Sequence, residues 1–110
     1  MSALDGVRVL DLSSSVAGAW CSRQFADFGL DVVLVEPADG HPLRRLAPFA
    51  SDGTSIPARY AQAGKRSLVL DRSRAEDRET LARLAASCDI VIDSFSPGSL
   101  ADWGLDFDTL

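Results

Sequence analysis

The chain has 110 residues, which is about the length of one domain. Hydrophobic residues make up 46% and charged residues 25%, which excludes a disordered tail or a disulfide-stapled miniprotein. The net charge of −5 argues against a nucleic-acid partner, because binding nucleic acid needs a broad cationic face. No apolar run approaches the roughly 20 residues of a membrane span and no signal peptide is visible, so we expect a cytoplasmic domain without a membrane partner.

The first third of the chain predicts a strand, a helix and a second strand. A β-rich run covers residues 7–12, and the serines at 13–15 can cap a helix over about 16–28 that Gly29 ends. Residues 31–36 form a continuous apolar run, typical of a parallel strand covered on both faces, and Pro37 closes it.

Residues 37–64 form a long irregular segment with four prolines and three glycines, in which we expect one helical turn near 58–63. Loops of this length in compact domains are usually functional or disordered. The segment overlaps a basic island at 41–66, whose net charge of +4 leaves −9 for the rest of the chain. The cations Arg44, Lys65 and Arg66 are candidates to bind a small polyanion such as a nucleotide; the alternative is a solvated loop.

The last third predicts a strand, a helix, a strand and a turn. Residues 67–71 form the third strand, and Ser73 with Glu76 forms a capping box that opens a helix ending at Cys88. One face of this helix is predicted to be buried, with Leu81, Leu84, Ala85 and Cys88 at i, i+3, i+4 and i+7. A fourth strand covers 89–93, and a turn at 94–98 leads into a short helix through Trp103 that Gly104 ends.

This alternation predicts an α/β fold over residues 1–110, with a Rossmann-like parallel sheet and flanking helices. Ligands of such sheets bind beyond the carboxyl ends of the strands. Three of these ends are residues 13–17, 36–40 and 94–98, and we expect a ligand site where they meet.

The first strand-to-helix turn lacks the glycine fingerprint of dinucleotide-binding proteins, since only Gly18 is present, and a nicotinamide cofactor is therefore disfavoured. Its small residues favour either an anion at the helix start or close packing of helix on strand. His41 is the only histidine and no nucleophile elbow accompanies it, so no catalytic residue is assigned. Cys21 and Cys88 lack ligand spacing, so we predict no metal site and two buried, reduced thiols.

Four segments of the chain together resemble the family III CoA-transferases. The first is LDGVRVLDL at 4–12 with the Ala-Gly pair at 17–18, and the second is ADFG at 26–29 with the strand ending in Glu-Pro at 36–37. The third is GKRSLVLD at 64–71, and the fourth is FSPGSL at 95–100 followed by Gly-Leu at 104–105. These segments occur in order and at matching spacing, so the resemblance covers essentially the whole chain.

The resemblance implies the N-terminal Rossmann-like part of a longer, interlocked-dimer enzyme. In the transferases of this family an aspartate attacks an acyl-CoA thioester and carries the acyl group as an anhydride, so that CoA moves between carboxylic acids. The implied substrate is acyl-CoA, and the implied protein partner is a second copy or the remainder of the enzyme. By analogy, the CoA contacts are Val16, Ala17, Leu70, Asp71, Arg72, Ser73, Ser94, Phe95 and Ser96.

The chain also departs from the family pattern. Ala19, His41 and Ser94 stand where proline, aspartate and asparagine are usual, and Asp102 replaces an arginine expected to contact CoA. The catalytic aspartate of the family falls beyond Leu110, so no aspartate here is given that role and the chain alone is expected to be inactive. The alternatives are part of a 2-methylacyl-CoA racemase, a non-catalytic acyl-CoA or nucleotide-binding module, and a structural remnant that only associates with a partner chain.

Overall fold

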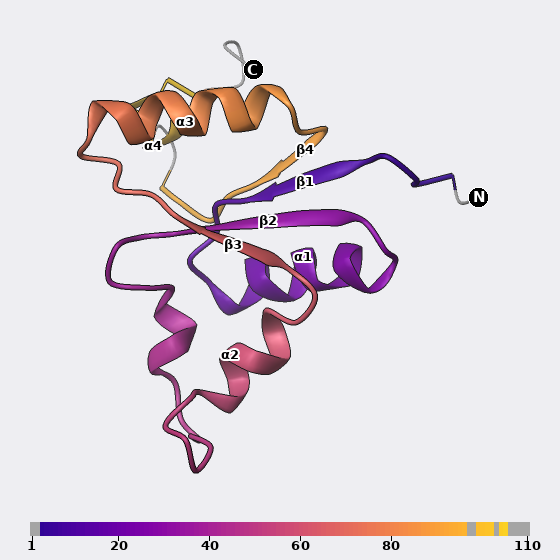
Figure 1. Ribbon diagram of the computed structural model, residues 1–110, viewed down its shortest axis with the longest axis vertical. Coiled ribbons are helices and arrows are strands. Elements are labelled where there is room, and N and C mark those ends of the chain that lie inside the picture. Colours follow the sequence, from indigo (N-terminus) through magenta and orange to yellow (C-terminus); the bar gives the residue numbers. More distant parts are fainter. Residues whose placement is uncertain (1–2, 97–98, 103, 106–110) are drawn as a thin grey trace.

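The computed structural model describes residues 3–96, 99–102 and 104–105. Within these residues, four strands form one parallel sheet in the order β3-β2-β1-β4 (Figure 1). The strands are β1 (Arg8–Asp11), β2 (Asp31–Glu36), β3 (Arg66–Val69) and β4 (Ile90–Ile92). The predicted α/β fold with a parallel sheet is confirmed.

Helices cover both faces of the sheet. The helix α1 (Val16–Asp27) lies on one face, and α3 (Ala75–Ala86) lies on the other, beside the short α4 (Ser99–Asp102) (Figure 1). Successive residues of β1 pack on opposite faces of the sheet. Val9 packs with Leu30 and Val32, whereas Leu10 packs with Leu81 and Ala85 of α3. This double burial explains why the segments of the two central strands, β1 and β2, are apolar runs rather than alternating patterns.

The two ends of α1 follow the sequence signals. Ser15 is the N-cap, and its hydroxyl oxygen accepts a hydrogen bond from the Gly18 amide at 3.0 Å. Gly29 follows the last turn with a φ of +87°, the left-handed conformation that glycine adopts most easily.

The capping box predicted for α3 is wrong. The N-cap is Arg74, which makes no side-chain capping bond, and the Ser73 hydroxyl instead donates to Asp71 Oδ1 at 2.6 Å. The Ser73 hydroxyl therefore stabilises the turn before α3 and does not cap the helix, because the carboxylate of Asp71 competes successfully for it. The predicted inner face of α3 is confirmed, because Leu81 and Ala85 are buried and the other two members pack against the same cluster.

The segment at 37–64 is folded. It contains η1 (Pro42–Arg45) and α2 (Ile56–Ala61), and an isolated antiparallel bridge joins Phe49 to Ser55. The expected turn near 58–63 is α2, which begins earlier. Leu43, Ala58 and Ala61 form a small core with Ala19, and this packing attaches the segment to α1.

Three further expectations concern the surface of the fold. Cys21 is exposed and not buried as predicted, because the inner face of α1 is formed by Gly18, Ala19 and Ser22; Cys88 is half-buried. The short helix expected through Trp103 is represented by α4, and Pro97, Gly98 and Trp103 lie outside the described residues. In the part of the chain that is described, no helix is long and apolar enough to cross a bilayer.

Candidate functional site at the carboxyl ends of the strands

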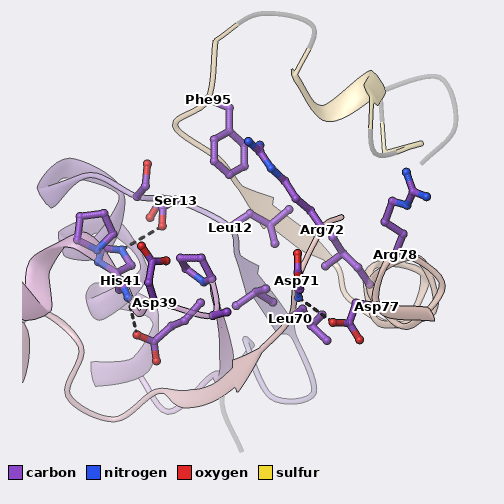
Figure 2. Close-up of a pocket in the computed structure, with 17 residues that line it drawn as sticks. Leu12, Ser13, Asp39, His41, Leu70, Asp71, Arg72, Asp77, Arg78 and Phe95 are labelled. Carbon is purple, nitrogen blue, oxygen red and sulfur yellow. Dashed lines mark hydrogen bonds between the residues drawn. The ribbon is translucent and has the colours of Figure 1, made fainter. Parts of the chain in front are cut away.

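A cavity of about 410 Å³ opens where the carboxyl ends of the strands meet (Figure 2). Its wall combines residues 12–14 after β1, residues 37–39 and 41–42 after β2, residues 70–72 after β3 and Phe95 after β4, with side chains from α3. The strand ends that the sequence analysis expected to converge therefore lie around one cavity, in the usual position of ligand sites in open parallel sheets.

On the β1 side, a buried carboxylate organises the turn. Asp11 accepts hydrogen bonds from the Ser13 amide at 2.8 Å and the Ser13 hydroxyl at 2.6 Å, and also from the Ser22 hydroxyl. Its ionic partner is Lys65, whose Nζ lies 3.3 Å away; the two side chains are 0% and 1% exposed. Burial lowers the pKa of Lys65, and the nearby Asp11 charge opposes that shift.

Lys65 is a structural residue in this arrangement. Its ammonium also donates to the Ala19 carbonyl at 2.9 Å and to Gln62 Oε1. These partners occupy its three donors, so the ammonium has no donor left for a phosphate.

On the β2 side, Glu36 is held by three partners. Arg44 donates to both carboxylate oxygens at 2.6 and 2.8 Å, the Ser67 hydroxyl donates to Oε2, and the His41 amide donates to Oε1 at 3.0 Å. The Arg44 hydrogen bonds are the main reason that the pKa of Glu36 falls to about 2, since burial acts in the opposite direction. The charge of Arg44 is thereby neutralised beside the cavity.

His41 links two walls of the cavity. Its Nδ1 accepts from the Leu43 amide at 3.1 Å, so Nε2 carries the proton and donates to the Ser13 carbonyl at 3.0 Å (Figure 2). Burial lowers the pKa of this imidazole. With both ring nitrogens engaged and the side chain buried, His41 caps η1 and connects it to the β1 turn.

On the β3 side, two carboxylates shape the turn that leads into α3. Asp71 Oδ1 accepts from the Ser73 amide at 2.9 Å and from its hydroxyl, and these bonds lower the pKa of Asp71. Asp77 Oδ2 accepts from the Asp71 amide at 2.8 Å. Arg72 stands on this turn, and in Figure 2 its side chain extends toward the Phe95 ring.

The residues implied as CoA contacts fall into two groups. Leu70, Asp71, Arg72 and Phe95 line the cavity, and Ser73 is fixed to Asp71 beside it. The hydroxyl of Ser94 accepts from the Ser14 amide at 2.9 Å, which joins β4 to the β1 turn at the cavity edge. Outside the lining are Val16, Ala17 and Ser96, all of which are exposed.

The cations of the basic island do not share a face. Arg44 pairs with Glu36, Lys65 with Asp11, and Arg66 with both carboxylate oxygens of Asp31 at 3.0 and 2.7 Å. Arg66 lies at the amino end of β3, whereas the cavity lies at the carboxyl ends of the strands. The structure therefore separates the three candidates and gives each a carboxylate.

Of the two interpretations of the first turn, the geometry supports close packing. A Cβ on Gly18 would lie 2.2 Å from Ser13 Cβ, so α1 can approach the turn this closely only with glycine there. Sequence reasoning missed several cavity residues, namely Leu12, Asp77, Arg78 and Leu81. The sequence places Arg78 and Leu81 on one predicted helix, but it does not show that this helix brings both residues to the carboxyl ends of the strands.

Three comparisons with known proteins bear on this chain. Residues 4–110 match the family described as CoA-transferase family III. The chain is 41% identical to a succinyl-CoA:mesaconate CoA-transferase of Haloarcula hispanica, covering 100% of this chain and 29% of the relative. It is 38% identical to a succinate–glutarate CoA-transferase of Agrobacterium fabrum, covering 97% and 28%.

Among solved structures, a CAIB/BAIF family protein from Brucella suis superimposes with a TM-score of 0.89 at 34% identity. That match covers 98% of this chain and 30% of the other. The chain thus spans less than a third of the length of the relatives it matches. Because the family match covers residues 4–110 and the fold agrees with that of the solved structure, this chain belongs to the family III CoA-transferases.

Proposed function

We propose that this chain forms the CoA-binding N-terminal part of an enzyme that transfers CoA between carboxylic acids, with acyl-CoA bound in the cavity at the strand ends. The observation that carries the proposal is an overlap between two sets of residues, the cavity lining and the CoA contacts implied by the family resemblance. The residues that line the cavity after β3 and β4 are also residues that the family resemblance implies as CoA contacts. Relatives with 41% and 38% identity are CoA-transferases by name.

The chemistry of the cavity suits part of an extended thioester. Its lining contains the apolar side chains Leu12, Val35, Leu70, Leu81 and Phe95, together with serine hydroxyls and charged side chains. An apolar lining with a few polar groups is the usual composition of a cofactor site. Of the implied contacts, we retain for CoA those near the cavity and assign Arg44, Lys65 and Arg66 to the ion pairs described above.

We further propose that the nucleophile is an aspartate supplied outside this chain. Its carboxylate oxygen would attack the thioester carbonyl carbon, displace the CoA thiolate and leave an aspartyl anhydride. Three of the four acids that line the cavity are otherwise engaged, since Glu36 holds Arg44, and Asp71 and Asp77 hold the β3–α3 turn; the fourth, Asp39, is exposed. On this proposal the chain alone has no transferase activity and acts in a homodimer or with the remainder of the enzyme.

Calorimetric titration with CoA and acetyl-CoA tests the proposal. Ala38 is exposed at the cavity wall, so Ala38→Trp should fill the cavity and abolish binding. Ala63→Trp, at an exposed position away from the cavity, is the matched control and should bind as the wild type does. Failure of the wild type to bind CoA at millimolar concentration would contradict the proposal, and equal binding of ADP and CoA would favour a nucleotide-binding module instead.

A further inference from the structure

The charged groups of the cavity differ between its two walls. The wall after β2 carries Glu36, already neutralised by Arg44, and the exposed Asp39. The wall formed by the β3–α3 turn and the first turn of α3 carries the two guanidinium groups of the lining, Arg72 and Arg78. The same wall also carries Asp71 and Asp77, so its formal charge is balanced, whereas the β2 wall adds the negative charge of Asp39. An anionic end of a ligand is therefore disfavoured at the β2 wall.

The carboxylates of Asp71 and Asp77 accept hydrogen bonds within the β3–α3 turn. Asp77 Oδ2 accepts from the Asp71 amide at 2.8 Å, and Asp71 Oδ1 accepts from Ser73. Among the described residues no carboxylate lies within ion-pair distance of Arg78. By contrast Arg74, one turn earlier, pairs with Glu76 at 3.4 Å and lies outside the lining.

We propose that Arg78 binds an anionic oxygen of the ligand and so fixes its direction in the cavity, with the anionic end toward α3 and away from Asp39. This inference rests on the proposed function, because it takes a CoA thioester as the ligand. A guanidinium fits both phosphoryl and carboxylate oxygens through paired N–H donors. The two sources are the phosphates of CoA and the free carboxylate of a dicarboxylic acyl group.

The test compares Arg78→Gln with Arg74→Gln as matched control, using CoA, acetyl-CoA, succinyl-CoA and the phosphate-free pantetheine. For an exposed arginine we expect Arg78→Gln to weaken binding of the anionic ligand by about 3- to 10-fold. Arg74→Gln should change nothing, Arg78→Lys should retain part of the affinity, and pantetheine should bind both variants as it binds the wild type.

The pattern of loss identifies the anion. Equal loss for CoA and acetyl-CoA assigns Arg78 to the phosphates, whereas loss confined to succinyl-CoA assigns it to the acyl carboxylate. Amide shifts caused by CoA but not by pantetheine should then concentrate at residues 75–78 in the phosphate case. A loss shared by pantetheine, or no loss with any anionic ligand, overturns the inference while the proposed function stands. Absence of CoA binding by the wild type overturns both.

Discussion

Single side chains between the strand ends determine the shape of the cavity wall. Asp11, Glu36 and His41 are buried, and each joins segments that are distant along the chain, through Lys65, Ser67 and Ser13 respectively. A buried ionisable group is stable only while its partners remain in place. The behaviour of these residues on titration or substitution therefore reports on the integrity of the cavity.

Stability should depend on pH through His41. Its pKa is lowered from 6.5 in the fold, so the unfolded chain binds more protons below that pH. The free energy of unfolding should be level near pH 7.5 and should fall as the pH drops through 6.5. Urea denaturation between pH 5 and 7.5 measures this slope. In His41→Asn, whose side chain does not titrate, that part of the slope should vanish; a persistent slope would assign it to other groups.

Removing Lys65 should be costly because its removal leaves Asp11 as an unpaired buried charge. We expect Lys65→Met to lower the free energy of unfolding by about 3–5 kcal/mol. The adjacent Arg66→Met breaks an exposed ion pair with Asp31 and should cost less than about 1 kcal/mol. Denaturant midpoints of the two variants give the comparison. Similar losses would show that burial of the Asp11–Lys65 pair does not govern its contribution.

At the scale of elements, the order of strands and helices follows from hydrophobic periods, and these were readable in the sequence. Two local predictions are wrong: one where two groups compete for the same hydroxyl, and one where small residues occupy the inner face of a helix. Ser73 bonds to Asp71 rather than capping α3, and Cys21 lies outward because smaller residues occupy the inner face of α1. Neither outcome is encoded in the local pattern alone.

The contact of α1 with the β1 turn can be tested at Gly18. Alanine is favoured over glycine in helices by about 1 kcal/mol, so propensity alone predicts that Gly18→Ala is stabilising. The contact with Ser13 predicts the opposite, a net loss of about 1–3 kcal/mol from overpacking. Thermal and urea unfolding decide the sign. The double variant Gly18→Ala/Ser13→Gly, which removes the clashing Cβ, should recover part of the loss.

For the whole molecule, charge along the sequence and charge in space lead to different conclusions. The island at 41–66 has a net charge of +4 in sequence, yet Arg44, Lys65 and Arg66 find their partners in β2 and β1, within the acidic remainder. The location of the site could be predicted, because parallel strands bring their carboxyl ends together. Which cations face the cavity could not be predicted, because that depends on pairing across the sheet.

The buried pair of Asp11 and Lys65 also has a consequence for the order of events during synthesis. The two residues are 54 positions apart, so the ribosome releases β1, its serines and all of α1 before the lysine exists. Until then the carboxylate of Asp11 has hydroxyl and amide donors but no counter-ion, and its burial is opposed by desolvation. The N-terminal turn of a nascent chain can therefore reach its final packing only after residue 65 has emerged.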